Sequence, residues 1–337
     1  MLAALLENFN SDLVIKDVDF PIRKNSMESI IRVEATGLCH GDLHIIKGDW
    51  NYFIKINLPK ILGHEVIGRI VESDFFSKGD LVAVYNILGC NECRYCKVGK
   101  PQYCNTPKFL GIDFDGGFAE YMLVPDNSML FKVEGDPIAL APLVDSGITA
   151  YNAVKDIEEN ASILIIGTSA VAQIALQILK YKNVGEIIVV GRNMKRLEIF
   201  ERFGADTIIP LENYERLSEN LLKVLGNKKK FDYILDFIGS DNTLRDIIWF
   251  LAKNGELRII GEFGGNLQVN ENLLVLRGLR IKGILYGDKS DFIKVYKLYK
   301  NNIIKIITTK YSLYEINKAI KDLYNGNIIT RAVITPQ

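Results

Sequence analysis

The sequence lacks three features that would set its class at once: an excess of charge of one sign, a long apolar run, and a repeated or low-complexity segment. Its 41 basic and 41 acidic residues give a formal net charge of zero, so bulk charge favours neither nucleic acid nor an anionic membrane as a partner. No apolar run is long enough to span a bilayer, and the opening MLAALLENFNSD lacks the basic start and cleavage site of a signal peptide. We therefore expect a soluble, cytoplasmic protein with a small-molecule partner.

A chain of 337 residues exceeds the size at which single cores usually stop growing, so two domains are expected. Short β-rich runs broken by turns, up to about residue 141, predict a partly open barrel. Between residues 142 and 283, buried apolar runs alternate with helical patterns, which predicts a parallel sheet covered on both faces. Residues 284–337 are expected to return to the first domain. The segments 255–261 and 279–285 are candidate sheet edges for assembly.

Cysteine is scarce, with five in the chain, and four of them stand in one short polar stretch that has no apolar core of its own. Four closely spaced thiolates complete the tetrahedral shell that zinc favours and leave no open position for chemistry. Disulfides are the alternative, although a reducing compartment favours metal. The stretch, in a lobe at residues 86–110, therefore predicts a structural zinc site formed by Cys90, Cys93, Cys96 and Cys104.

Cysteine, histidine and carboxylate groups also occur in three segments far apart in the sequence. A catalytic zinc keeps three protein ligands and one exchangeable position, and Cys, His and Asp provide that set, although each residue alone is more often structural. The three segments are GLCHGDLH with Cys39, His40, Asp42 and His44, GHEVIG with His64 and Glu65, and PLVDSGIT with Asp145.

These segments, the CNECRYC lobe, the stretch GIDFDGGFAEYMLVP and the strand-turn-helix near Gly167 occur in the order and spacing of a known family. Over nearly its whole length the chain resembles the zinc-containing medium-chain dehydrogenase/reductase family, the alcohol dehydrogenases. The resemblance implies an α/β fold with a GroES-like, partly open β-barrel catalytic domain at residues 1–141 and 284–337. It also implies a Rossmann domain, a doubly wound parallel sheet, at residues 142–283.

The resemblance further implies that Cys39 and His64 bind the catalytic zinc and that Asp145 stands where relatives carry a Cys or acidic ligand. Glu65 would lie near this metal and be able to approach it. Asp42 would hold the His64 ring in the tautomer that a metal needs. Such a zinc ion acts as a Lewis acid on an alcohol or carbonyl oxygen.

The chain departs from the family where relatives commonly carry a Ser or Thr hydroxyl that passes the alcohol proton outward. That position is Gly41 here. A water, the nicotinamide ribose and His44 are candidate substitutes, because general acids and bases can act through one water. Alternatively, the reaction does not need this relay.

A cofactor loop is predicted where the strand at 162–166 leads into the helix at 170–180. Gly167 allows a tight turn, and small residues let backbone and helix approach a pyrophosphate at the helix N-terminus. The following strand ends without the carboxylate typical of NAD enzymes, and Arg192 can pair with a 2′-phosphate instead, so NADP(H) is expected over NAD(H). Arg331 stands where relatives approach the pyrophosphate. The remaining expected cofactor residues are Thr168, Ser169, Ala170, Val171, Gly191 and Asn193.

The substrate pocket should lie between the domains, where α/β folds usually bind their ligands. The resemblance implies that Trp50, Tyr85, Asn86 and Phe109 line it. The leading hypothesis is a zinc-dependent alcohol dehydrogenase with two zinc ions per chain, acting on alcohols and the matching aldehydes or ketones as a homo-oligomer, either dimer or tetramer. The alternatives are a polyol or sugar dehydrogenase, an enone reductase, which Gly41 slightly favours, and a nucleotide sensor without catalysis. A nucleic-acid binder is disfavoured because basic residues around the lobe are few.

Overall fold

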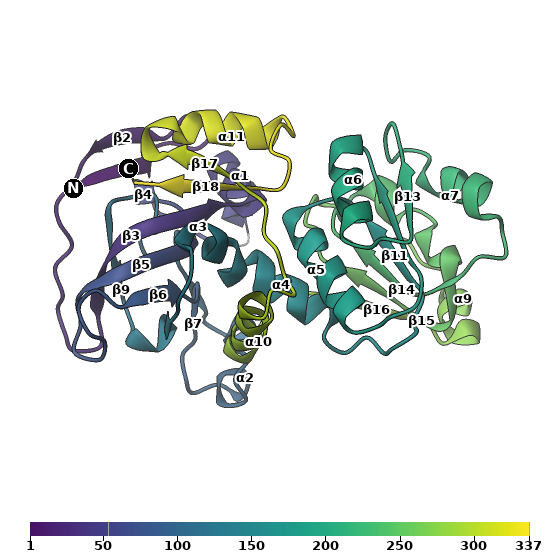
Figure 1. Ribbon diagram of the computed structural model, residues 1–337, viewed down its shortest axis with the longest axis horizontal. Helices are drawn as coiled ribbons and strands as arrows, with labels where there is room; N and C mark the ends of the chain where they lie inside the picture. Colours follow the sequence, from purple (N-terminus) through teal and green to yellow (C-terminus); the bar gives the residue numbers. More distant parts are fainter. Residues whose placement is uncertain (53, 337) are drawn as a thin grey trace. The chain divides into compact units, whose positions relative to one another are not determined.

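The structure is a computed structural model that describes residues 1–52 and 54–336, and its chain divides into two compact units (Figure 1). The catalytic unit, as we name it, consists of the described residues of Met1–Ile148, Asp288–Ile293 and Ile306–Gln337; the nucleotide unit consists of Thr149–Gly287 and Lys294–Lys305. The sequence predicts boundaries after residues 141 and 283, whereas the units change over after Ile148, Gly287, Ile293 and Lys305. Two helices therefore contain a change of unit, namely α4 (Ser146–Val154) and α10 (Lys289–Lys300).

A seven-stranded sheet forms the centre of the catalytic unit. Its order is β10-β6-β5-β3-β18-β17, and β9 also pairs with β3. Alternate residues of its strands, including Ile31, Val66 and Val84, point into one apolar core. The strands are β3 (Ser29–Leu38), β5 (Glu65–Glu72), β6 (Leu81–Val84), β9 (Tyr121–Val124), β10 (Leu130–Lys132), β17 (Thr308–Ser312) and β18 (Arg331–Thr335).

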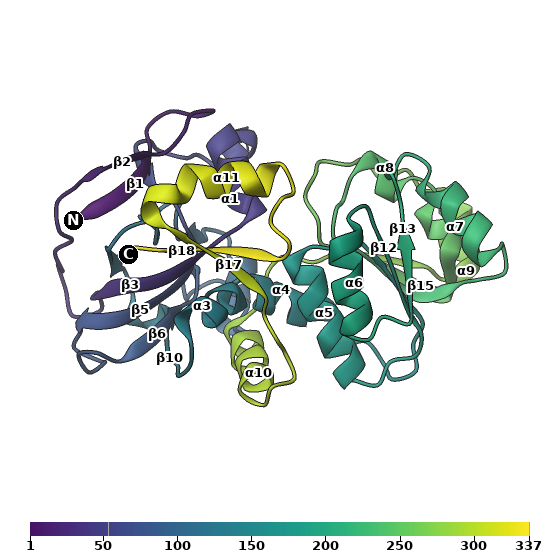
Figure 2. The same ribbon diagram turned by 45° about the horizontal axis from the view of Figure 1, so that its top comes forward.

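Strands from the two ends of the chain lie side by side in this sheet (Figures 1 and 2). β18 runs antiparallel to β3, with Ala332 opposite Leu38. Helix α11 (Ile316–Tyr324) and helix α1 (His40–Lys47) pack into one core with strand β1 (Leu2–Leu6). The return of residues 306–336 brings Arg331 beside the start of β5.

Short elements complete the catalytic unit. They are β2 (Val14–Asp17), η1 (Asp49–Tyr52), β4 (Lys60–Ile61), β7 (Ile87–Leu88), α2 (Arg94–Lys97), η2 (Pro101–Tyr103), β8 (Lys108–Phe109), η3 (Asn127–Met129), α3 (Pro137–Leu140), η4 (Ala141–Val144) and η6 (Leu313–Glu315). Four of them, β7, α2, η2 and β8, lie in the lobe that carries the four clustered cysteines. Strand β7 pairs with β8, and β1 lies between β2 and β4.

The nucleotide unit contains the parallel sheet that the apolar runs predict. Its order is β13-β12-β11-β14-β15-β16, the 3-2-1-4-5-6 arrangement of a doubly wound fold. Pairing is parallel throughout, and β11 lies between β12 and β14. The strands are β11 (Ile163–Ile166), β12 (Ile187–Gly191), β13 (Thr207–Pro210), β14 (Phe231–Asp236), β15 (Leu251–Ile259) and β16 (Arg280–Gly283).

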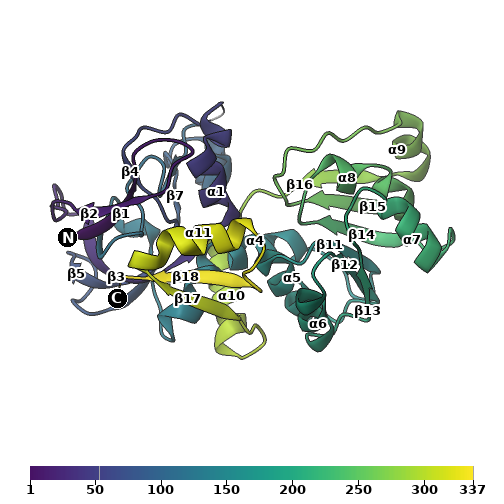
Figure 3. The same cartoon turned by 90° about the horizontal axis from the view of Figure 1, so that it is seen from above.

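Helices cover both faces of this sheet, with α5 (Ala170–Tyr181) and α6 (Met194–Arg202) on one side (Figure 3). On the other face, α7 (Leu217–Leu225), α8 (Asp241–Leu244), η5 (Ile247–Phe250) and α9 (Glu271–Arg277) pack into one core with β11 and β12. Of the two candidate edges, β16 is an edge strand with all four residues exposed, but β15 pairs on both sides. Within the described residues, no helix combines the length and apolarity needed to cross a membrane.

Candidate metal centres and cofactor loop

Cys39 stands at the junction of strand β3 and helix α1, with extended backbone angles of φ −112° and ψ 161°. Its N–H donates to Asp42 Oδ2 at 2.9 Å. A helix of eight residues is marginal alone, so this cap and the burial of Leu43, Ile45 and Ile46 hold it in place. The buried Asp42 is thereby fixed beside Cys39.

His64 follows Gly63, whose φ of +93° lies in the region that glycine tolerates. Its Nδ1 lies 3.3 Å from Asp42 Oδ1, and its Nε2 lies 3.7 Å from Asp145 Oδ2. Asp145 Oδ2 also lies 3.7 Å from Cys39 Sγ. Burial opposes the protonated imidazole, but Asp42 first, and then Asp145 and Cys39, outweigh it and raise the pKa of His64 well above its usual value. Such surroundings favour a cation at this point.

Cys39, His64, Glu65 and Asp145 each offer one ligand atom, and these atoms all lie within 4.8 Å of one another. A thiolate, an imidazole nitrogen and a carboxylate oxygen are the donors that zinc accepts. The donor chemistry therefore fits the catalytic zinc expected from the sequence. All four residues belong to the catalytic unit.

Glu65 differs from the other three because its carboxylate already has a cationic partner. Arg331 Nε donates to Glu65 Oε2 at 3.0 Å, and Arg331 Nη2 donates to Oε1. Ser146 Oγ donates to the same Oε1 at 3.4 Å. A Cβ at position 37 would lie 1.7 Å from Glu65 Oε2, so this carboxylate fits only beside glycine. Arg331, expected near a pyrophosphate, is buried against Glu65 in this structure.

Four more sulfur atoms, those of Cys90, Cys93, Cys96 and Cys104, also lie within 4.8 Å of one another. None of the five cysteines, all of which lie in the described part of the chain, forms a disulfide. Backbone N–H groups, first that of Cys96, lower the pKa of Cys93 to about 6. Burial raises the pKa of Cys96 to about 12. Four clustered sulfurs with no oxygen donor match a closed structural zinc site.

The expected cofactor loop joins β11 to α5 in the nucleotide unit. Gly167 adopts a φ of +96°, and its N–H donates to Val190 O at 3.0 Å. Ser169 Oγ accepts from Ala172 N at 3.2 Å, which caps the 12-residue helix α5. A Cβ on Gly191 would lie 2.6 Å from Thr168 Cγ2, so the ends of the first two strands approach each other closely here. Ala170 and Val171 form the first turn of α5.

The end of β12 carries a cation and no carboxylate. The Arg192 guanidinium lies 5.4 Å from the centre of the Tyr214 ring. Asn193 caps the N-terminus of α6, and its Oδ1 accepts from Arg196 N at 3.2 Å. Burial is the main cause that raises the pKa of Tyr214 to about 12, so this ring is neutral beside Arg192 near neutral pH.

The expected pocket residues occupy different surroundings. Trp50 stacks on His44 at 5.5 Å between ring centres, and His44 Nδ1 lies 2.9 Å from Asp49 Oδ2. Phe109 packs against the same apolar core as Trp50. Tyr85 is buried, with the Lys289 ammonium 5.8 Å from the centre of its ring. The fourth residue, Asn86, is buried just beyond β6.

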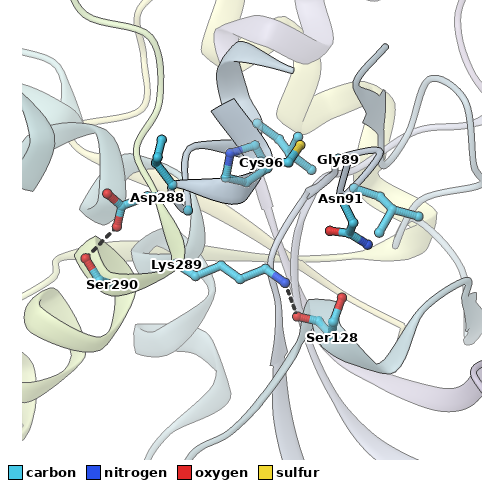
Figure 4. A pocket seen from close by; sticks show the side chains of 12 residues that line it. Gly89, Asn91, Cys96, Ser128, Asp288, Lys289 and Ser290 are labelled. Atoms are coloured by element: carbon cyan, nitrogen blue, oxygen red, sulfur yellow. Dashed lines mark hydrogen bonds between the residues drawn. The ribbon is translucent and has the colours of Figure 1, made fainter. Parts of the chain in front are cut away.

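A cavity of about 380 Å³ lies in the catalytic unit between the cysteine lobe and the start of α10 (Figure 4). Lys289 crosses it and donates to Ser128 O. Ser290 Oγ donates to Asp288 Oδ1 at 2.6 Å at the other end of Lys289 in this view. Its lining includes Cys96 but none of Cys39, His64, Glu65 and Asp145. The cavity is therefore separate from the candidate catalytic centre.

Sequence reasoning missed Gly37, Asp49 and Ser146 as parts of the site. Gly37 leaves room for Glu65, Asp49 holds His44, and Ser146 donates to Glu65. No local motif marks Gly37. The one signal in the sequence that could have indicated Ser146 is its position directly after the candidate ligand Asp145.

Two family models match the chain: the alcohol dehydrogenase GroES-like domain at residues 25–135 and the zinc-binding dehydrogenase at residues 170–301. An NAD-dependent alcohol dehydrogenase of Sulfurisphaera tokodaii is 34% identical over 350 residues, covering 100% of both chains. The D-arabinose 1-dehydrogenase (NADP(+)) of Saccharolobus solfataricus is 33% identical, covering 99% of this chain and 97% of its own. The crystal structure of an alcohol dehydrogenase from Aeropyrum pernix matches 100% of both chains with a TM-score of 0.92 at 30% identity.

Proposed function

Because the chain belongs to the zinc-containing medium-chain dehydrogenase/reductase family, the alcohol dehydrogenases, we propose that it is a zinc-dependent alcohol dehydrogenase that prefers NADP(H). The family, the GroES-like and Rossmann folds and an oxidoreductase activity on CH–OH groups follow from the matches. The finer proposal is supported best by one observation: candidate ligand atoms of Cys39, His64 and Asp145 lie within 4.8 Å of one another. The proposed substrates are primary or secondary alcohols and the matching aldehydes or ketones.

In this proposal, Cys39 Sγ, His64 Nε2 and Asp145 Oδ2 hold the catalytic zinc. Asp42, 3.3 Å from His64 Nδ1, keeps the proton on that nitrogen and leaves Nε2 for the metal. When bound, zinc supplies Lewis acidity toward the alcohol or carbonyl oxygen, and nicotinamide accepts or supplies hydride. Arg331 keeps Glu65 in an ion pair, so we do not count Glu65 among the resting ligands.

Proton removal must proceed without a hydroxyl at Gly41. We propose His44 as the acceptor, reached through a water, because general bases act through one intervening water. Asp49 holds the imidazole at 2.9 Å, and stacking on Trp50 fixes its plane.

The preference for NADP(H) is supported by the end of β12. An NAD enzyme usually places Asp or Glu there for the ribose hydroxyls, whereas this chain has Gly191, Arg192 and Asn193. A guanidinium pairs with a 2′-phosphate through charge-assisted hydrogen bonds. The names of the relatives weigh against this preference, since three relatives at 33–34% identity are named NAD-dependent and one at 33% identity is named NADP(+)-dependent. A catalytic efficiency with NADH equal to or above that with NADPH would contradict the preference.

We also propose a homo-oligomer, dimer or tetramer, joined at the exposed edge strand β16. A light-scattering mass equal to one 38.0 kDa chain at micromolar concentration would contradict it. A cytoplasmic location stays a prediction from the sequence.

The function is tested by an absorbance screen of alcohols, aldehydes, ketones and enones with NADP(H) and NAD(H), with and without a chelator. Chelator-sensitive oxidation of an alcohol is the expected result. Turnover of enones alone would favour a double-bond reductase. Cofactor binding with no turnover of any compound would favour a non-catalytic nucleotide sensor.

A further inference from the structure

The Lys289 ammonium is half-buried and has no carboxylate partner in the described part of the chain. Within residues 1–52 and 54–336, its Nζ donates one hydrogen bond, to the backbone carbonyl of Ser128, and the Tyr85 ring is centred 5.8 Å away. Burial lowers the pKa of Lys289, and Asp126 only partly offsets this effect. A cation removed from water is unfavourable unless it is paired, so the remaining donors of this ammonium call for an anion.

The carboxylates nearest to Lys289 in sequence, Asp288 and Asp291, are used to start helix α10. Asp291 N donates to Asp288 Oδ1 at 3.0 Å, and Asp288 N donates to Asp291 Oδ2 at 3.0 Å. Such reciprocal caps satisfy the first N–H groups of a helix. Figure 4 shows the Lys289 side chain extending away from Asp288 and across the cavity toward Ser128. These two carboxylates therefore stabilise the helix and leave the ammonium unneutralised.

The cavity that Lys289 crosses has the size of a ligand pocket. Its volume of about 380 Å³ falls within the range of roughly 300–1,000 Å³ that is typical of small-molecule sites. Lys289 is the one basic side chain among the described residues that line it, and Asn91 adds an amide donor. Leu88, Val98 and Pro101 add apolar surface. A ligand that matches this lining carries one negative charge and a short hydrocarbon part.

Charge balance favours a carboxylate over a phosphate in this cavity. A phosphate carries more than one negative charge near neutral pH, and Lys289 can neutralise only one. The excess charge would face the Asp288 carboxylate and the sulfur of Cys96, which line the same cavity. A carboxylate carries a single charge and forms a charge-assisted hydrogen bond with an ammonium.

We propose that this cavity binds a small monocarboxylate, whose carboxylate pairs with Lys289 and whose hydrocarbon part lies against Leu88 and Pro101. None of the four candidate catalytic ligands lines the cavity, so the inference is independent of the proposed function. The bound molecule contacts both the cysteine lobe and the start of α10, a helix that continues into the nucleotide unit.

The test is isothermal titration without cofactor, using butyrate, its uncharged analogue butyramide, and inorganic phosphate. The wild type should bind one butyrate per chain, at least roughly tenfold more tightly than butyramide or phosphate. Lys289→Met should weaken butyrate binding by about 10–100-fold, and Lys289→Arg, which keeps the cation, should bind more tightly than Lys289→Met. The matched control is Lys97→Met, at an exposed lysine of the same lobe, which should keep the wild-type affinity. Equal affinities for butyrate and butyramide, or an unchanged affinity in Lys289→Met, would overturn the proposal.

A carboxylate can also bind a catalytic metal, so a second variant separates the two sites. Butyrate binding should persist in Asp145→Ala, which alters the candidate catalytic centre and leaves the cavity intact. Loss of butyrate binding in Asp145→Ala together with its retention in Lys289→Met would place the molecule at the catalytic centre and overturn the proposal. Binding that depends on Lys289, in a protein that oxidises no alcohol, would contradict the proposed function and support this inference.

Thermal melting tests the premise that Lys289 has no anionic partner within the chain. Lys289→Met should melt at or above the wild-type temperature, because an apolar side chain replaces a half-buried cation that no described carboxylate pairs with. Saturating butyrate should raise the melting temperature of the wild type and leave that of Lys289→Met unchanged. A lower melting temperature in Lys289→Met would mean that the ammonium already stabilises the fold, which would contradict the proposal.

Discussion

Arg331 and Glu65 form a two-point ion pair between residues that stand 266 positions apart in the sequence. Their side chains are 6% and 0% exposed. The pair closes one side of the candidate metal centre, because Glu65 adjoins His64 and Arg331 Nη2 lies 3.8 Å from Asp145 Oδ2. It ties the last strand of the chain to the start of β5.

Replacing Arg331 with Met should destabilise the catalytic unit by about 3–5 kcal/mol, because it leaves the buried Glu65 carboxylate without its cation. Urea unfolding measures the loss. Arg69→Met is the matched control, since Arg69 pairs with Glu34 at the surface. This substitution should lower the free energy of unfolding by less than about 1 kcal/mol. The double variant Glu65→Gln/Arg331→Met should recover part of the lost stability. A loss equal to the sum of the losses in the two single variants would argue against the ion pair between Glu65 and Arg331.

Asp145→Ala should remove one of two metals. Elemental analysis of the wild type should give about two zinc ions per chain, and the variant about one, because Cys39 and His64 alone leave the catalytic site a ligand short. Cys104→Ser is the reciprocal variant: it should lose the lobe zinc and keep the catalytic one. An unchanged count in Asp145→Ala would remove Asp145 from the ligand set.

Arg192→Leu should lower kcat/KM for NADPH by roughly 10–100-fold, because the 2′-phosphate loses a charge-assisted contact. The efficiency with NADH should not fall. Arg202→Leu, at an exposed arginine on α6, is the control. It should leave kcat/KM unchanged for both NADPH and NADH. Equal losses for NADPH and NADH would show that Arg192 supports the fold of this loop instead.

Stability should decline in alkaline solution between about pH 10 and pH 12. Burial, with the hydrogen bond from Tyr311 to Asp322, raises the pKa of Tyr311 to about 12. The unfolded chain loses that proton near pH 10, so it binds fewer protons than the folded chain in this range and stability falls as pH rises. Urea unfolding at pH 9–12 should show a shallower decline for Tyr311→Phe. Tyr314→Phe, at a residue 70% exposed, should retain the wild-type slope.

The parallel sheet was predictable because its strands are continuous apolar runs, and such runs are buried on both faces. Helix α1 was not predictable from the sequence, although it carries Asp42 and His44. Eight residues, one of them Gly41, give little periodicity, and the helix is held by the Asp42 cap and by packing against α11. The residues of α1 and its neighbours in the sequence do not indicate that α11 packs against it, because α11 lies near the other end of the chain.

The candidate site divides in the same way. Cys39, His64 and Asp145 are predictable as candidate ligands because each stands in a recognisable segment and the segments match one family. The pairing of Arg331 with Glu65 depends on β18 lying beside β3, and no pattern in either segment indicates it. Gly37 likewise has no visible role until the position of the Glu65 carboxylate is known.

Gly41→Ser would restore the hydroxyl common in relatives, yet it should lower kcat/KM by roughly threefold to tenfold. The new Cβ would lie 3.2 Å from Trp50 Cη2 and 3.4 Å from His64 Cε1, closer than most side chains tolerate, so the ring must shift. Trp50 also stacks on His44, and its displacement disturbs the proposed proton acceptor. Trp50→Leu supplies the missing space, so Gly41→Ser/Trp50→Leu should be more active than the product of the two single effects predicts. Multiplicative losses would mean that Trp50 and position 41 act independently, and a gain in Gly41→Ser alone would mean that the missing hydroxyl limits the rate.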